Sequence, residues 1–333
     1  MLEGLPVLVT GGAGYIGSHT CKALAAAGAR PVVFDDLSTG HRDAVRWGAL
    51  VRGDVRDRGA VAAALMRHEI SYVLHFAGKA YVGESMQDPG KYYDNNVGGM
   101  IGLLAACTEA GVGRVVFSSS CATYGLPERL PITEDTPQRP INPYGRTKLI
   151  CEQMLRDHGS ALGLHHVSLR YFNAAGADPE GEIGERHDPE THLIPLALMA
   201  ASGQGPVLKV FGTDYPTPDG TCVRDYIHVA DLARAHVRAV EHLMAGGESL
   251  ALNLGSGRGF SVREITAAIE AATGRAVPVE DAPRRPGDPP ELTADAGLAA
   301  RLWGFRAERS DIADIVRDAA PWFGLGGGDG DKV

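Results

Sequence analysis

The sequence lacks the features that mark membrane, disulfide-rich and nucleic-acid-binding proteins. No apolar run approaches the roughly 20 residues of a membrane-spanning helix, and no basic region with a cleavage site marks a secretory signal. The five cysteines are odd in number and scattered without metal-site spacing, which is typical of free thiols in the cytosol. A formal charge of −9 argues against nucleic acid. We therefore expect a cytoplasmic protein without a metal, membrane or nucleic-acid partner.

What is present is enough apolar sequence, 44% of 333 residues, for one large core or two modest ones. Apolar strands expected at 6–10, 31–34, 72–78, 114–117 and 166–170 alternate with helices expected at 15–27, 90–110 and from 143. This order predicts an α/β fold with a doubly wound parallel sheet over residues 1–170. Shorter elements, including helices near 195–202, 262–273 and 310–318, predict a smaller α/β domain over 171–323. Residues 324–333 form a glycine-rich acidic tail, which we expect to be disordered.

The first strand runs directly into a glycine-rich loop. Gly11, Gly14 and Gly17 stand between the strand and the helix, where free amide groups and the helix dipole favour a phosphate. The next strand ends at Asp35, 18 positions after Gly17, and an acidic residue there suits a ribose 2′-hydroxyl and repels a 2′-phosphate. The alternative is a glycine-rich turn that merely packs closely. The order of strand, loop, helix, strand and acid favours a dinucleotide site for NAD rather than NADP.

Tyr144 and Lys148 are four residues apart, so on a helix they share one face about 6 Å apart. Asn142 and Pro143 have the N-cap and N1 residue types and predict that the helix begins there. A nearby ammonium group would lower the tyrosine pKa from its ordinary value of about 10. Ser120 follows a buried strand and is expected opposite the tyrosine, which suits proton transfer at an alcohol. The alternative is a surface tyrosine and lysine on an amphipathic helix.

Four further segments carry residues that suit ligand binding. Asp54 and Val55 follow a third strand and are expected near the adenine, while the strand at 72–78 carries small residues, Ala77 and Gly78, where a cofactor could lie against the backbone. Arginines at 224 and 284–285 have the fork geometry that binds diphosphate oxygens. A single surface arginine is usually solvated, so these two segments matter chiefly as a pair.

With these residues in view, the chain resembles the extended short-chain dehydrogenase/reductase family, and within it the UDP-glucose 4-epimerases and their UDP-pentose relatives. The resemblance covers residues 6 to about 323. The matching segments are 10–18, 75–78, 82–85, 92–96, 117–120, 142–145, 170–173, 219–221 and 223–228.

The resemblance implies roles for individual residues. Tyr144 would be the base, Lys148 would hold the nicotinamide ribose and tune Tyr144, and Ser120 would relay the proton. The NAD contacts would be Gly11, Gly14, Tyr15, Ile16, Gly17, Asp35, Asp54, Val55, Phe76, Ala77, Gly78, Asn95, Ser118, Tyr144, Lys148 and Tyr171. The UDP-sugar contacts would be Ser120, Tyr144, Asn173, His192, Leu193, Phe211, Arg224, Tyr226, Arg285, Asp288 and Leu292. The implied reaction is epimerisation at C4 through transient oxidation by tightly bound NAD. The implied assembly is a homodimer formed by the helices at about 90–110 and 143–158.

Three positions depart from the family pattern and leave the substrate open. Lys79-Ala80-Tyr81 replaces a segment in which bacterial epimerases carry a lysine one place later. His192 stands where an asparagine commonly contacts the nucleotide. Leu292 stands where a tyrosine lines the sugar pocket of strict UDP-glucose enzymes, which implies relaxed specificity towards UDP-xylose/UDP-arabinose or the N-acetylhexosamine pair. Dehydratases and decarboxylases of this fold carry an acid after the serine, whereas Cys121 follows here. A non-catalytic NAD-sensing module would usually lose Tyr144 or Lys148.

Overall fold

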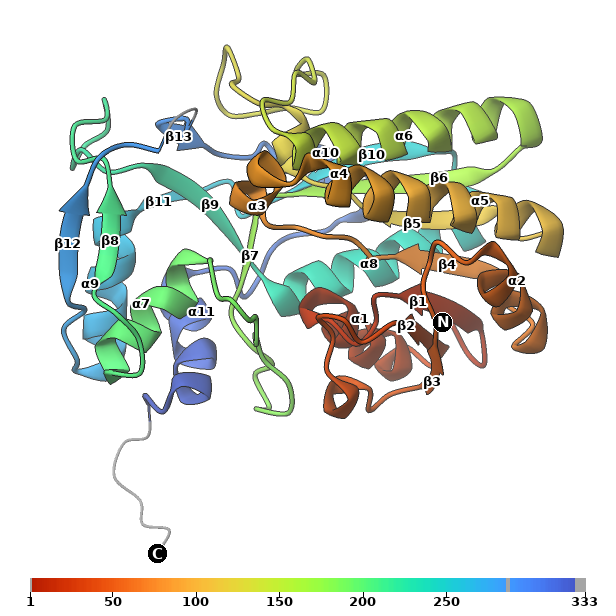
Figure 1. Ribbon diagram of the computed structural model, residues 1–333, viewed down its shortest axis with the longest axis horizontal. Coiled ribbons are helices and arrows are strands. Elements are labelled where there is room, and N and C mark those ends of the chain that lie inside the picture. Colours follow the sequence, from red (N-terminus) through yellow and green to blue (C-terminus); the bar gives the residue numbers. More distant parts are fainter. Residues whose placement is uncertain (1, 286–287, 327–333) are drawn as a thin grey trace, which may run out of the picture.

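A seven-stranded sheet forms the centre of the larger part of the molecule (Figure 1). The structure, a computed structural model, describes residues 2–285 and 288–326. The strands lie in the order β10-β6-β5-β4-β1-β2-β3, and every neighbouring pair is parallel. Their bounds are β1 Pro6–Thr10, β2 Arg30–Asp35, β3 Ala49–Arg52, β4 Tyr72–His75, β5 Arg114–Ser118, β6 His165–Tyr171 and β10 Leu250–Leu254.

Helices cover both faces of this sheet, because its strands are apolar on both sides. In β1, Val7 and Val9 enter one core cluster and Leu8 enters the other, as alternation along a strand requires. The first cluster includes α1 (Tyr15–Ala26), α8 (Val229–Met244) and α10 (Gly297–Trp303). The second includes α2 (Arg58–Arg67), α5 (Gly98–Ala110) and α6 (Pro143–Leu162). The predicted doubly wound α/β fold is confirmed.

The sheet does not follow the expected division of the chain at residue 170. Strand β10 pairs with β6 in register, with Leu252 opposite Leu169. Helix α8 also comes from the second half of the chain, and Leu232 and Val240 on it belong to the core beneath the sheet. The chain therefore returns to the larger part of the molecule after residue 228. Strand β10 extends the sheet beside β6, and the apolar face of α8 packs into the core beneath the sheet.

The smaller part is built from short strands and three helices. A four-stranded sheet contains β7 (Asn173–Ala175), β9 (Val223–His228), β11 (Gly259–Ser261) and β13 (Glu291–Leu292), and β8 (Leu208–Phe211) pairs with β12 (Val279–Ala282). Its core is formed with α7 (Leu193–Ser202), α9 (Val262–Thr273) and α11 (Ile312–Ala319). Leu325 is buried in this core, so the tail expected to be disordered from residue 324 is ordered through residue 326. Residues 327–333 lie outside the described residues.

The segment expected as one helix over 90–110 has three parts. Helix α4 (Pro89–Tyr92) leads into a π-helical turn, η2 (Tyr93–Val97), and then into α5. The turn carries Asn95 and Asn96. The remaining short elements are α3 (Val82–Gln87) and the 3₁₀ turns η1 (Arg42–Ala44), η3 (Cys121–Thr123) and η4 (Ala320–Phe323).

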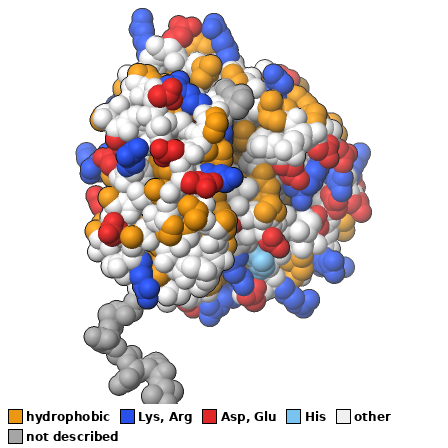
Figure 2. Space-filling view, turned by 60° about the vertical axis from the view of Figure 1, so that its left-hand side comes forward, with side chains coloured by type: hydrophobic (Ala, Val, Ile, Leu, Met, Phe, Trp, Pro, Cys, Tyr) orange, Lys and Arg blue, Asp and Glu red, His pale blue; other side chains and the backbone are white. Residues whose placement is uncertain are grey.

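The surface carries mixed charge on the face shown in Figure 2, where acidic and basic side chains are interspersed. Among helices of the described residues, none combines the length and apolar character needed to cross a bilayer.

Candidate active site

The loop between β1 and α1 is a backbone turn that needs glycine at two positions. Gly11 has a φ of +71°, and a Cβ there would lie 2.6 Å from the Ala77 backbone nitrogen. A Cβ on Gly17 would collide with the Gly11 carbonyl oxygen. Gly14 is the N-cap of α1 and provides no capping side chain. The amide groups of the first helical turn are therefore available to an anion.

Asp35 lies beside this loop at the end of β2. Its Oδ2 accepts a hydrogen bond from the Ala13 amide at 3.0 Å, and its Oδ1 accepts one from the Leu37 amide at 2.8 Å. Burial raises the pKa of Asp35, and these two hydrogen bonds oppose that rise. The side chain is thus held in one orientation next to the phosphate-binding turn, where a ribose would follow the phosphate.

Five of the other residues expected to contact the cofactor share one edge of the sheet. They follow or end parallel strands and are Phe76, Ala77, Gly78, Ser118 and Tyr171. The hydroxyl groups of Ser118 and Tyr171 hydrogen-bond to each other. Ligands of open α/β sheets bind at this carboxyl edge.

Most of the remaining residues expected to contact the cofactor make contacts with other residues of the protein. Asp54 pairs with Arg56, which also binds Asp94. Val55 is buried in the core beneath α5, and Asn95 donates to the Asn96 side chain at 3.0 Å. Tyr15 donates its hydroxyl to the Gly176 carbonyl at 2.6 Å, and Ile16 packs against the core. The Tyr15 contact ties α1 to the loop that follows β7.

Ser120, Tyr144 and Lys148 lie where β5 ends and α6 begins. Helix α6 starts as predicted, because the Asn142 side chain accepts a hydrogen bond from the Gly145 amide at 2.8 Å and Pro143 follows the cap. Tyr144 and Lys148 are buried, with 8% and 6% of their surface exposed. The Lys148 Nζ donates to the Ser118 carbonyl at 2.7 Å and lies 5.8 Å from the centre of the Tyr144 ring. The alternative of an exposed surface pair is thereby excluded.

Burial shifts the acid–base properties of this pair in a way that the sequence did not predict. It raises the pKa of Tyr144 well above the ordinary value, although a hydrogen bond with Ser120 opposes the rise. Burial also lowers the pKa of Lys148 to about 8. The expectation of a lowered tyrosine pKa is therefore wrong for the protein without ligands, because loss of hydration on burial is the largest effect on this group.

The expected UDP-sugar contacts line the start of the smaller part. Asn173 on β7 donates its side-chain amide to the Asp225 carbonyl at 2.9 Å. Arg224 on β9 forms an ion pair with Asp288. The Arg285 guanidinium lies 4.0 Å from the centre of the Phe211 ring at the end of β8. Arg224 thus belongs to the four-stranded sheet and Arg285 contacts the end of β8. Tyr226 is buried in the core of the smaller part, and Leu193 packs against that core.

Leu292 lies on β13 opposite Arg224 on β9. Its side chain is partly buried and packs, with Cys121, against a small core of Tyr124, Ile132, Phe172 and Ala294. Leu292 therefore shares this small core with Cys121 and Tyr124, which follow Ser120 in the chain. The Tyr81 ring lies 6.0 Å from the His187 ring and 6.4 Å from the His192 ring.

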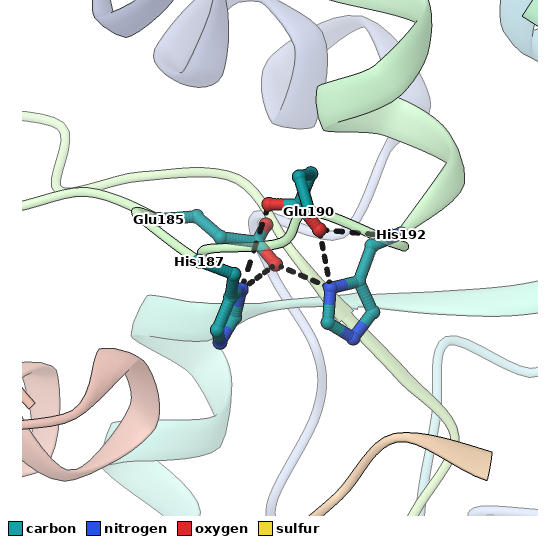
Figure 3. Close-up of side chains that lie close together, drawn as sticks. All are labelled: Glu185, His187, Glu190 and His192. Carbon is teal, nitrogen blue, oxygen red and sulfur yellow. Dashed lines mark hydrogen bonds and ion pairs between the residues drawn. The ribbon is translucent and has the colours of Figure 1, made fainter. Parts of the chain in front are cut away.

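His192 belongs to a cluster that sequence reasoning missed (Figure 3). The segment before α7 places Glu185, His187, Glu190 and His192 together, with the Nδ1 atoms of both rings facing the two carboxylates. Burial lowers the pKa of each histidine, but the carboxylates outweigh it and raise the pKa of His187 to about 9 and that of His192 to about 10. The pattern Glu-x-His-x-x-Glu-x-His at 185–192 was the available signal.

A second unpredicted group holds α6 against the sheet. Arg170 on β6 donates to Glu152 on α6 at 2.7 Å, and both residues are buried. The Glu152 carboxylate also accepts from the Ser119 hydroxyl. Because Ser119 precedes Ser120, this network fixes α6 relative to the loop that carries the candidate catalytic serine.

Comparison with known proteins identifies relatives over nearly the whole chain. The model of the "NAD dependent epimerase/dehydratase family" matches residues 7–255. A curated UDP-glucose 4-epimerase from Rhizobium meliloti is 56% identical over 316 residues, which are 95% of this chain and 96% of the relative.

Solved structures agree with this assignment. The UDP-glucose 4-epimerase from Brucella ovis in complex with NAD is 61% identical with a TM-score of 0.95, covering 96% of this chain and 99% of that one. The enzyme from Stenotrophomonas maltophila, with bound NAD and formylated UDP-arabinopyranose, is 45% identical with a TM-score of 0.93, covering 96% and 98%. The resemblance predicted from the motifs is confirmed, and the chain belongs to the NAD-dependent epimerase/dehydratase family.

Proposed function

We propose that this protein interconverts UDP-glucose and UDP-galactose by transient oxidation at C4 with bound NAD. The observation that carries the proposal is the buried group of Ser120, Tyr144 and Lys148 at the carboxyl edge of the sheet. The dinucleotide loop and Asp35 lie on the same edge, so hydroxyl chemistry and cofactor binding meet at one place.

The residues present fit NAD. The Gly11–Gly17 turn has no room for side chains at two positions and offers free amides to the diphosphate. Asp35 holds a buried carboxylate where ribose hydroxyls would hydrogen-bond, and Lys148 would reach the nicotinamide ribose. When bound, NAD would supply a nicotinamide ring that accepts the hydride from C4 of the sugar. The positive charge of this ring would also favour the phenolate form of a nearby tyrosine.

Within this site Tyr144 takes the proton from the sugar 4-hydroxyl, and Ser120 orients that hydroxyl by hydrogen bonding. Together with the hydride that bound NAD would accept from C4 of the sugar, loss of this proton would leave a 4-keto sugar, and Tyr144 would return the proton when the alcohol forms again. Lys148, anchored on the Ser118 carbonyl, keeps its charge next to the Tyr144 ring. Tyr144, which would act first as the base and then as the acid, is shielded from bulk water.

The UDP part is held by residues of the smaller part. Arg224 and Arg285 supply guanidinium groups for the diphosphate, and the other contacts are Asn173, His192, Leu193, Phe211, Tyr226 and Asp288. Binding chiefly through UDP leaves the keto sugar free to present either face for reduction. This freedom is what turns a dehydrogenase site into an epimerase site.

A second candidate is a broader substrate range, which the position of Leu292 favours. Leu292 packs against the small core that includes Tyr124, and the resemblance implies a tyrosine at this position in strict enzymes. An apolar leucine wall discriminates weakly between substrates. The Stenotrophomonas relative binds a UDP-arabinopyranose derivative. UDP-xylose/UDP-arabinose or the UDP-N-acetylhexosamine pair would then be additional substrates.

The test is an assay of the purified protein with UDP-galactose, UDP-N-acetylgalactosamine and UDP-xylose, without added NAD. We expect turnover of UDP-galactose and recovery of NAD from the denatured protein in near-equal amount to the chain. Bound NAD without turnover of any pair would favour the NAD-sensing module. A net loss of water or carbon dioxide from the sugar would favour a dehydratase or decarboxylase.

We also propose a cytosolic homodimer. The five cysteines are free, which suits a reducing compartment. By resemblance, α5 and α6 of each chain would form the interface, and Ile101 on α5 is 57% exposed. Sedimentation at micromolar concentration should give a dimer, and replacing Ile101 by glutamate should weaken it. A monomeric wild-type protein would overturn this assembly.

A further inference from the structure

The four side chains ahead of α7 converge on one small volume. One nitrogen or oxygen of each residue lies within 4.8 Å of the corresponding atoms of the other three. The His187 Nδ1 lies 3.1 Å from Glu185 Oε1 and 3.5 Å from Glu190 Oε2. The His192 Nδ1 lies 3.0 Å from the same Glu185 oxygen and 2.8 Å from Glu190 Oε1. Figure 3 shows both rings turned with these nitrogens toward the carboxylates.

Hydrogen bonding accounts for only part of this arrangement. Of the four contacts, that between His192 and Glu190 has hydrogen-bond geometry. Glu185 Oε1 and His187 Nδ1 are fully buried and make no hydrogen bond. The Glu185 side chain is only 5% exposed. This buried Glu185 oxygen lies between the two ring nitrogens but accepts a hydrogen bond from neither. A buried polar atom usually has a partner, so we infer that the oxygen faces a point that all four side chains share.

The spacing fits a metal centre. A tetrahedral ion with bonds of about 2.0–2.1 Å to nitrogen and oxygen separates neighbouring ligand atoms by about 3.3 Å. The four nitrogen–oxygen distances are 2.8 to 3.5 Å, on both sides of that value, with Glu190 presenting Oε2 to His187 and Oε1 to His192. Two imidazoles and two carboxylates are a ligand set that suits zinc and its neighbours in the first transition row.

We propose that the loop before α7 binds one divalent transition-metal ion of the Zn²⁺ class, through Glu185, His187, Glu190 and His192. Four protein ligands close the coordination sphere, which is the pattern of a structural rather than a catalytic ion. The ion cross-links two turns of the loop and fixes where α7 begins. Bound through Nδ1, His192 keeps its Nε2–H as a donor of fixed direction, and its side chain is 43% exposed. Use of this Nε2–H to contact the UDP-sugar rests on the proposed function, whereas the metal site does not.

A second acidic group in the same loop differs because a lysine already supplies its counter-charge. Asp178, Glu180 and Glu182 also lie within ligand distance of one another. The Lys22 ammonium contacts all three carboxylates at 2.7 to 2.8 Å and supplies their counter-charge. This group therefore has its cation already, and it provides a matched control.

The experiment measures metal in the full-length protein, independently of activity. Wild-type protein is dialysed against a chelator, reloaded with ZnCl₂ or CoCl₂ and desalted. We expect about one Zn²⁺ per chain and, with Co²⁺, the intense visible absorption of a tetrahedral site. His187→Gln and Glu185→Gln should each weaken Zn²⁺ binding by more than the roughly 10- to 100-fold that loss of an outer-shell partner costs.

Glu180→Gln in the lysine-bound group and His165→Gln on the exposed end of β6 should bind Zn²⁺ like the wild type. Circular dichroism establishes that each variant is folded. If His187→Gln does not fold, the wild-type Co²⁺ spectrum and Zn²⁺ stoichiometry still decide the matter. Wild-type protein that retains no Zn²⁺ after desalting, or the same amount as His187→Gln, would overturn the proposal and leave two ion pairs in its place.

Discussion

At the residue scale, Asp35 is the feature that selects the cofactor. Two backbone amides orient its buried carboxylate beside the glycine turn, so a ribose diol would gain charge-assisted hydrogen bonds and a 2′-phosphate would be repelled. We predict that Asp35→Asn weakens NAD binding about 10- to 100-fold, as expected for loss of about 1.5–3 kcal/mol from hydrogen bonds to a charged group. Titration of cofactor-free protein measures this. Asp36→Asn, one residue away, is the control. Unchanged preference for NAD over NADP in Asp35→Asn would remove Asp35 from cofactor selection.

Leu292 decides substrate range on the same scale. Its side chain packs against the same small core as Cys121 and lacks the bulk and hydroxyl of a tyrosine. We predict that Leu292→Tyr lowers kcat/KM for the N-acetylhexosamine or pentose pair by about 10- to 100-fold relative to the hexose pair, equivalent to about 1–3 kcal/mol. Leu292→Met, which conserves volume, should change the ratio little. If the wild type uses only the hexose pair and tyrosine changes nothing, Leu292 is not the gate.

At the element scale, the position of α6 depends on a buried ion pair. Glu152 and Arg170 are 1% and 4% exposed, and removing the carboxylate leaves a guanidinium buried without its partner. We predict that Glu152→Ala lowers the free energy of unfolding by about 3–5 kcal/mol and also lowers kcat, because α6 carries Tyr144 and Lys148. Urea unfolding and turnover measure the two effects. Glu109→Ala, which breaks the exposed pair with Arg58, should cost about 0–1 kcal/mol. Equal losses in both variants would contradict this role.

Elements were predictable where their signals are local. The turn at Gly11–Gly17 and the capped start of α6 follow from residues adjacent in sequence. Strand β10 and helix α8 were missed as members of the first layer, because β10 joins β6 across about 80 residues and no local pattern reports that pairing. The cluster of Glu185, His187, Glu190 and His192 was missed for a related reason. These side chains come together only when the loop that carries them is folded. Burial of Tyr144, which reverses the expected pKa direction, is likewise a tertiary property.

At the scale of the whole molecule, buried histidines make stability depend on pH. Burial lowers the pKa of His19, His166 and His236 to about 4 and that of His75 to about 3. In the unfolded chain they titrate near pH 6.5. Between about pH 6.5 and 4 the unfolded state therefore binds more protons, so stability rises with pH and is lost on acidification.

We predict that the free energy of unfolding falls from pH 7 to pH 5, measured by urea denaturation at fixed NAD concentration. His236→Gln should flatten this dependence, whereas His165→Gln, at an exposed position, should not. His187 and His192, with raised pKa values, act in the opposite direction. A stability that stays constant over this range would contradict the prediction that the four buried rings outweigh them.

The central claim is that one buried tyrosine moves the proton of the sugar 4-hydroxyl, and Tyr144→Phe tests it most directly. The substitution removes only the hydroxyl, so the fold and the bound NAD should be retained. We predict that kcat for UDP-galactose falls by at least about two orders of magnitude, the usual size of a general-base contribution. Tyr93→Phe, on the π-helical turn and 37% exposed, should keep wild-type turnover. A near-normal kcat in Tyr144→Phe, with NAD still bound, would contradict the account.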